Sequence, residues 1–147
     1  MKRLIYSVEI NRPVELVFSK MLDKSVYRRW AAAWGEGMTF EGEWKQGANI
    51  SFFDQSQGGT KVIIEEFIPN ELIKARHIAM VNAENIEQEL SDEMMRKWIG
   101  SEENYYFKSG GDSKTTLEIE IVTDEAFEEM MGAWPEALRL LKEICEE

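Results

Sequence analysis

Apolar and polar residues alternate along the first ten positions of the chain. Every second residue from Leu4 to Ile10 is apolar, which predicts a strand with one buried face. Asn11-Arg12-Pro13 ends this strand, and Pro13 suits the first turn of a helix. Apolar residues then recur at helical spacing from Val14 to Leu22. A second short helix is expected from Asp23 to Trp34.

The apolar period returns to two between residues 38 and 122, apart from one polar and acidic stretch, 82–100. This pattern, broken by turn residues, predicts about six antiparallel strands after the helices. They are expected from Met38 to Trp44, around Ile50 and Phe52, and over Thr60–Ile68, Leu72–Met80, Glu103–Lys108 and Thr115–Val122. Within the acidic stretch, Ser91 is expected to cap a short helix, Asp92–Trp98.

The last part of the chain has a helical apolar stripe that contains a proline. The stripe consists of Phe127, Met130, Met131, Trp134, Leu138, Leu141 and Cys145. Pro135 cannot donate to the carbonyl of Met131, and its ring presses on that turn. We therefore predict a long helix, capped by Thr123 or Asp124 and kinked at Pro135. Because a long antiparallel sheet curls, a kinked helix on its concave face leaves a gap that large side chains fill or a cavity occupies.

Composition narrows the classes of partner. The chain has 147 residues and a net charge of −11, so one domain, 1–147, is expected. The acidic surface argues against nucleic acid and anionic membranes, which need clustered Lys and Arg. The N-terminal apolar run is too short for a signal peptide or membrane span, and cytoplasmic localisation is the expectation. Cys145 is the only cysteine, and we expect it to be an unreactive side chain packed in the core.

The hairpin over residues 60–80 gives a prediction of which side chains face the helix. Lys74 and Arg76 should face water, so Ile73, Ala75, His77 and Ala79 should face inward. A two-residue turn at Asn70-Glu71 would place Val62, Ile64, Glu66 and Ile68 inward too, with Ile64 opposite His77 and Glu65 beside Arg76. This register predicts that Glu66 lies diagonally beside His77 on the concave face. A slip of one residue in the pairing would turn the inward side chains of the strand outward.

The order of elements, with these residues, resembles the START-like superfamily of helix-grip proteins, also called SRPBCC or pollen-allergen-like. It is similar in particular to the bacterial branch related to the activator of the heat-shock-protein ATPase. The resemblance is carried by INRPVELVFSKMLDKSVYRRW, FEGEWKQGANISFF, IIEEFIPNELI, WIGSEENYYF, TTLEIEI and MGAWPEALRLLKEICE. It implies an α+β fold in which an antiparallel sheet of six to seven strands wraps around the kinked C-terminal helix. It also implies an apolar cavity, which in this superfamily holds hydrophobic small molecules.

The expected function is non-catalytic binding of a hydrophobic or amphipathic small molecule between sheet and helix. The candidate ligand-binding residues are Phe52, Ile64, Glu66, His77, Tyr105, Phe107, Ile119, Met130, Met131 and Trp134, with Glu66 and His77 at the polar end. Met side chains repack around varied shapes. Trp30 and Trp34 are candidates to seal the mouth, and Met94, Met95 and Trp98 to form a lid or to pack on the sheet edge.

Two other functions compete with binding. One is a protein-interaction or chaperone-regulator module, which includes the possibility of a homodimer. The other is a cyclase or dehydratase that uses Glu66, His77 or Tyr105. No catalytic residue is assigned, because Ser and Cys lack the context of a nucleophilic motif. No metal or other cofactor is expected, since His77 is the only histidine and no second ligand has suitable spacing.

Overall fold

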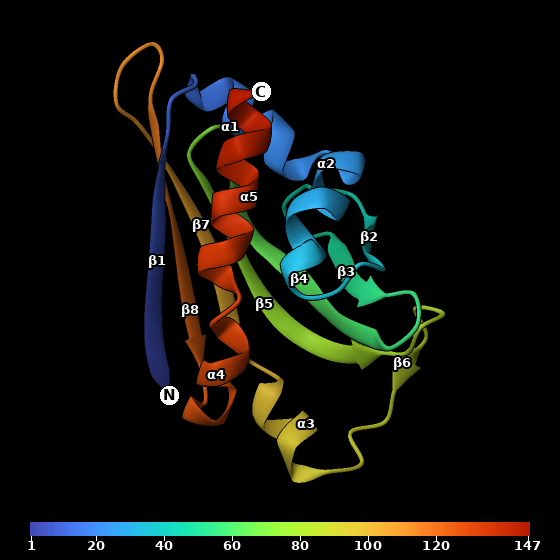
Figure 1. The fold of residues 1–147 in the computed structure, drawn as a ribbon. Helices are drawn as coiled ribbons and strands as arrows, with labels where there is room; N and C mark the ends of the chain where they lie inside the picture. Colours follow the sequence, from blue (N-terminus) through green and yellow to red (C-terminus); the bar gives the residue numbers. More distant parts are fainter.

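The antiparallel sheet accounts for most of the regular structure. The computed structural model describes residues 1–147 and confirms an α+β fold. The strands are β1 Lys2–Ile10, β2 Met38–Gly42, β3 Asn49–Asp54, β4 Gly58–Ile68, β5 Leu72–Val81, β6 Glu87–Gln88, β7 Glu102–Ser109 and β8 Thr115–Thr123. They form one eight-stranded sheet in the order β1-β8-β7-β5-β4-β3-β2, with the two-residue β6 on β5. The sheet bends strongly between its two ends (Figure 1).

The helices follow the predicted order. They are α1 Val14–Leu22, α2 Lys24–Trp30, the 3-10 turn Ala31–Ala33, α3 Glu93–Trp98, the 3-10 turn Glu125–Phe127, α4 Glu128–Met131 and α5 Trp134–Glu146. Asp23 caps α2 by accepting from the backbone N–H groups of Ser25 and Val26. Asp92 caps α3 by accepting from the backbone N–H of Met95, so the predicted cap at Ser91 was wrong by one residue. None of the helices is long and apolar enough to cross a membrane.

The C-terminal helix is kinked, as predicted, and the kink separates two helical segments. α4 ends at Met131. Pro135 cannot donate a hydrogen bond to the carbonyl of Met131, since proline lacks an N–H. Gly132 and Ala133 keep nearly helical backbone angles. α5 then restarts with Pro135 in its first turn, where the missing N–H has no partner to lose. Asp124 caps the start of the region by accepting from Ala126 N–H.

Two irregularities in the β4–β5 ladder increase its bend. The register shifts between Ile64 and Glu66 and again between Lys61 and Val62. The first shift leaves Glu65 without an opposite residue, and the second leaves Ile78 of β5 unpaired. Such bulges bend a strand and reverse which residues face each side.

The first bulge overturns part of the predicted register. The turn after β4 has three residues, with Ile68 opposite Leu72, and Val62 rather than Ile64 lies opposite His77. Glu66 therefore pairs with Lys74 on the outer side, and Phe67 takes the inward position. Ile68 is also directed outward and is exposed. The predictions that Glu66 and Ile68 face inward were wrong.

The second bulge overturns one further assignment: Ala79 pairs with Lys61, and Thr60 and Met80 take the cavity side, so the prediction that Ala79 faces inward was wrong. The inward residues between the two bulges were assigned correctly. Val62, Ile64, Ile73, Ala75 and His77 are buried. On the outer side, Nε of Arg76 lies 3.1 Å from a carboxylate oxygen of Glu65, as expected.

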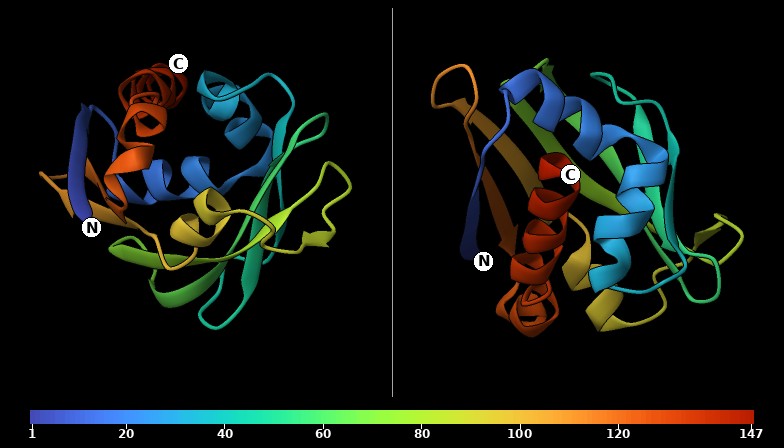
Figure 2. Two further views of the ribbon diagram at one scale, coloured as in Figure 1. Left: turned by 90° about the horizontal axis from the view of Figure 1, so that it is seen from below. Right: turned by 45° about the horizontal axis from the view of Figure 1, so that its top comes forward.

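The core lies between the concave face of the sheet and α5. The helix runs along β1 and beside α2, and Leu138, Leu141 and Ile144 are buried against the sheet. Viewed from its lower end, the molecule shows α5, α2 and the bent strands arranged around a central region, with α3 near the open end (Figure 2). The break between α4 and α5 also lies at this end (Figure 1).

Candidate ligand-binding site

A cavity of about 470 Å³ lies where α4, α2 and α3 meet the concave face of the sheet. It is lined by 22 residues, of which 14 are hydrophobic. Its volume is within the range of small-molecule binding sites and far exceeds the space of a few waters. The sheet and the kinked helix therefore enclose a space that could hold a small ligand.

Methionine and tryptophan are concentrated around this cavity. Six of the eight methionines and four of the five tryptophans line it. They are Met38, Met80, Met94, Met95, Met130 and Met131, with Trp30, Trp34, Trp98 and Trp134. Methionine has flexible torsions and a polarizable sulfur, so much of the lining can repack around ligands of different shape.

Aromatic rings form one continuous side of the cavity, called here the aromatic wall: Tyr27, Trp30, Trp34, Tyr105 and Trp134. Their ring centroids are 4.9 Å apart for Trp34 and Trp134, and 6.1 Å for Tyr105 and Trp134. The indole nitrogens of Trp30 and Trp134 are buried without a hydrogen-bond partner. These two rings are therefore held by packing alone.

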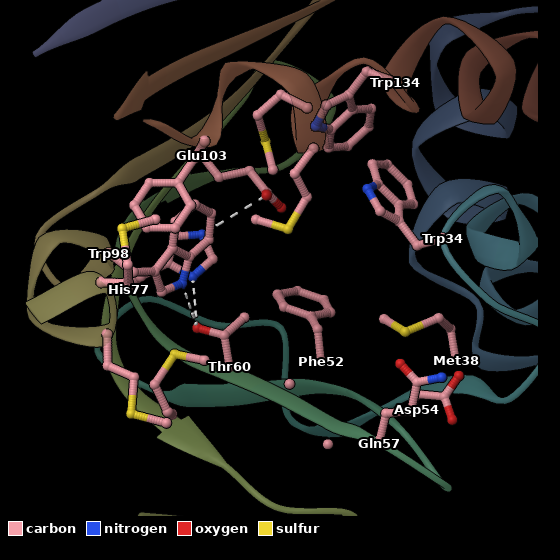
Figure 3. Close-up of a pocket in the computed structure, with 18 of the residues that line it drawn as sticks. Trp34, Met38, Phe52, Asp54, Gln57, Thr60, His77, Trp98, Glu103 and Trp134 are labelled. Carbon is pink, nitrogen blue, oxygen red and sulfur yellow. Dashed lines mark hydrogen bonds and ion pairs between the residues drawn. The ribbon is translucent and has the colours of Figure 1, made fainter. Parts of the chain in front are cut away.

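Another part of the cavity lining is polar (Figure 3). The Thr60 hydroxyl lies 2.9 Å from Nδ1 of His77 and 3.1 Å from the carbonyl oxygen of Ala79, and it accepts from Nε1 of Trp98 at 3.0 Å. A hydroxyl has one proton and a carbonyl only accepts. If all three contacts are hydrogen bonds, the Thr60 proton goes to Ala79 and a proton sits on Nδ1 of His77. This assignment, made from the network, leaves Nε2 of neutral His77 as an acceptor.

Glu103 on β7 lies next to that acceptor. Its Oε1 is 3.8 Å from Nε2 of His77, too far for a hydrogen bond, and its other oxygen accepts a hydrogen bond from the Tyr105 hydroxyl. Burial raises the pKa of Tyr105 well above its usual value, and the nearby Glu103 charge raises it further. The same two causes raise the pKa of Tyr27, so both phenols stay protonated at neutral pH.

A third polar position is found where β3 ends. The Asp54 carboxylate accepts from both the backbone N–H and the hydroxyl of Ser56. These hydrogen bonds lower the pKa of Asp54, so it is ionised at neutral pH. It also lies against Gly35 and Gly37, where a side chain would meet its carboxylate oxygens at 2.7 and 3.0 Å. Asp54 therefore shapes its loop as well as lining the cavity.

The mouth of the cavity is formed in part by α3 and α4. Met94 and Met130 line the cavity, yet about half of each side chain is exposed, an arrangement that places apolar groups at the opening. Trp98, at the end of α3, is buried, and its ring packs on His77 at 4.4 Å and on Phe127 at 5.0 Å. The segment predicted as a lid or as edge packing thus has an anchored end and a more exposed end.

The structure places six of the ten predicted site residues in the cavity lining. These are Phe52, His77, Tyr105, Met130, Met131 and Trp134, and Trp30 and Trp34 also line it. Ile64, Phe107 and Ile119 are buried in the core instead, and Phe107 packs on Phe18 of α1 at 5.0 Å. Glu66 faces outward, as the bulge requires. Sequence reasoning missed Glu103, Thr60, Met38 and Met80.

Nothing in the cavity resembles a metal centre. No group of three or more His, Cys, Asp or Glu side chains is arranged so that it could hold a metal ion. Cys145 is buried on α5, away from the cavity lining.

Comparison with known proteins gives a result for the fold alone. No protein-family model matches the chain and no curated protein is similar in sequence, but solved structures are similar in shape. The helix-grip fold is shown by this similarity. Protein MLL2253 from Mesorhizobium loti is 12% identical with a TM-score of 0.77, over 99% of this chain and 97% of that one.

Two further solved structures have the same helix-grip architecture. CalU16 from Micromonospora echinospora is 21% identical with a TM-score of 0.69, and the match covers 97% of this chain and 75% of CalU16. The Aha1 dimer from Colwellia psychrerythraea is 17% identical with a TM-score of 0.72, over 99% of this chain and 97% of that one.

Proposed function

We propose that the protein binds a hydrophobic or amphipathic small molecule in the cavity between the sheet and the kinked C-terminal helix, without catalysing a reaction. The observation that carries the proposal is the cavity of about 470 Å³ with its lining of six methionines and four tryptophans. Burying an apolar ligand there would contribute about 25 cal/mol per Å² of apolar surface removed from water. The His77–Glu103 side of the cavity would bind the ligand's polar group.

The distribution of exposed apolar side chains favours this function over a protein-interaction module. Away from the cavity, the large exposed apolar residues are Met1, Ile5, Ile68 and Ile86. Met1 and Ile5 lie at the start of the chain, Ile68 at the end of β4 and Ile86 just before β6, and none of them pairs with another across the sheet. A docking face needs a contiguous apolar patch, whereas Met94 and Met130 gather at the cavity.

A homodimer and a place in the branch similar to the heat-shock ATPase activator are finer proposals. Both rest on likeness to the Aha1 protein of Colwellia psychrerythraea, whose solved structure is a dimer. Sedimentation equilibrium across a range of protein concentrations would test the first. A mass equal to one chain at every concentration would contradict it.

An acid–base enzyme is the second candidate function, and one observation favours it. His77, Glu103 and Tyr105 meet at one end of the cavity, and Glu103 has the role predicted for Glu66. An imidazole and a carboxylate within reach of one substrate atom are suited to proton transfer. Incubation with a bound ligand, followed by chromatography and NMR of the recovered molecule, separates the two functions, because a carrier returns the ligand unchanged and an enzyme does not.

The proposed binding function is tested by native mass spectrometry of the protein purified from its own host. We expect a population heavier than the polypeptide by the mass of one small molecule, which is lost when the same sample is denatured. The supporting measurement is tryptophan fluorescence, because four of five tryptophans line the cavity. A bound ligand should quench it, and Trp134→Phe should remove most of the signal. The bare polypeptide mass, together with no fluorescence response to any apolar amphiphile, would refute the proposal.

A further inference from the structure

The polar side of the cavity presents two hydrogen-bond acceptors and no donor between them. With Nδ1 protonated toward Thr60, Nε2 of His77 offers a lone pair. Oε1 of Glu103 lies 3.8 Å away, while the other oxygen of this carboxylate is occupied by Tyr105. The His77 side chain is only 2% exposed, and Nε2 has no hydrogen-bond partner within the protein. Two neighbouring acceptors of this kind call for a donor from the ligand.

The acidic side chains in the cavity lining are not balanced by basic ones. Its lining includes the carboxylates of Asp54, Asp92 and Glu103 and contains no Lys or Arg. Glu103 makes no ion pair with a lysine or arginine, and its side chain is 14% exposed. A carboxylate so largely removed from water is costly unless an opposite charge or hydrogen bonds compensate it. No Lys or Arg supplies that charge; the groups next to this carboxylate are the Tyr105 hydroxyl, which donates to it, and the imidazole of His77, which is charged only when protonated.

A primary ammonium group matches both features. A nitrogen can lie about 2.9 Å from each of two acceptors that are 3.8 Å apart, since that is the usual N–H donor distance, and an ammonium has three N–H donors. A hydroxyl has one proton and would satisfy only one of the two acceptors.

We infer that the ligand is a cationic amphiphile, an apolar body with a protonated amine, and that its ammonium group binds between Nε2 of His77 and the carboxylate of Glu103. This inference rests on the proposed binding function and specifies its ligand class. Fatty acids and other anionic amphiphiles are disfavoured, because their carboxylate would lie next to Glu103 in a cavity whose lining has three carboxylates and no Lys or Arg. The apolar body lies among the methionines and the aromatic wall.

The test compares three probes with one hydrocarbon body: decylamine, decanol and decanoate. Each is titrated into the protein at pH 7 and followed by tryptophan fluorescence. The net charge of −11 attracts any cation at long range, so the titrations are run at physiological salt and repeated at higher salt, where such attraction is screened. We expect decylamine to bind about tenfold or more tightly than decanol, as a charge-assisted hydrogen bond would give, and decanoate to bind weakest.

Two isosteric variants test whether the preference for decylamine over decanol depends on Glu103. Glu103→Gln removes the charge in the cavity and should reduce decylamine affinity about tenfold, to that of decanol, while decanol affinity stays the same. Glu102→Gln is the matched control. It lies on the same strand and changes net charge equally, but it points to the outer face, where it accepts from Asn104, and should leave all three affinities unchanged.

The outcomes separate the two proposals. If none of the probes binds, the proposed binding function fails. If decanol binds as tightly as decylamine in the wild-type protein, or decanoate binds best, the binding function stands and the amine inference is overturned. If Glu103→Gln and Glu102→Gln lose the same amount of decylamine affinity, the preference for the amine comes from the overall charge of the protein. That result would also overturn the amine inference. The wild-type comparison needs no variant, so it decides even if Glu103→Gln fails to fold.

Discussion

Trp98 on α3 donates a 3.0 Å hydrogen bond from its indole nitrogen to the hydroxyl of Thr60 on β4. This bond ties the segment at the mouth of the cavity to the sheet. The same hydroxyl contacts His77, so the position of α3 and the orientation of the imidazole depend on one network. Loosening the bond should affect both the mouth and the polar side of the cavity.

Trp98→Phe is expected to keep ring packing but lose this hydrogen bond. The free energy of unfolding should fall by about 1 kcal/mol, measured by denaturant titration, and amide hydrogen exchange in α3 should accelerate. Trp44→Phe is the matched control, because the indole nitrogen of Trp44 is buried without a partner and no hydrogen bond is lost. Equal destabilisation by both variants would show that the Trp98–Thr60 bond contributes nothing.

Trp134 is 2% exposed, and its burial under the helix was predicted from the helical stripe. Trp134→Ala should lower the free energy of unfolding by about 3 to 5 kcal/mol, the usual cost of truncating a buried tryptophan. Trp34→Ala, which removes a ring of the same wall that is only partly buried, should cost less. An unmoved denaturation midpoint for Trp134→Ala would mean that the ring does not support the core.

The order of elements and the inward face of most strands could be predicted from the sequence. Alternation runs unbroken from Ile73 to His77, and all three inward residues of that run are buried. Glu66 was misplaced because a bulge at Glu65 reverses the parity of the strand. A signal for the bulge was available in the sequence, because regular alternation would bury the charged Glu66 and expose the apolar Phe67. One extra residue in the strand before them turns Glu66 outward and Phe67 inward.

The composition of the cavity was harder to predict. Parity along β7 puts Glu103 on the same face as Tyr105 and Phe107, so its inward direction could have been inferred from the same alternation. Which inward residues reach the cavity depends on where the helices lie on the sheet. Phe107 is covered by Phe18 of α1, and alternation contains no information about that contact.

The thiol of Cys145 should be unreactive in the folded protein. Burial raises its pKa to about 11, because removal from water disfavours the thiolate, which is the nucleophilic form. At neutral pH almost no thiolate is present, and the side chain is 3% exposed. Labelling with a disulfide reagent should be slow in buffer and rapid in denaturant. Fast labelling of the native protein at neutral pH would contradict the buried position on α5.

Pro135→Ala should straighten the C-terminal helix. The substitution restores an N–H that can donate to the carbonyl of Met131, and it removes the ring that presses on that turn. Gly132 and Ala133 already have φ values of −61° and −76°, so a small change in ψ would join α4 to α5. Because Met130 and Met131 line the cavity from α4, their movement should change its volume. A crystal structure of the variant tests this directly, and Glu136→Ala, one residue further along the first turn, is the control that should leave the kink in place. If the Pro135→Ala structure keeps both the kink and the cavity unchanged, Gly132 and the packing of Trp134 would be the cause of the break.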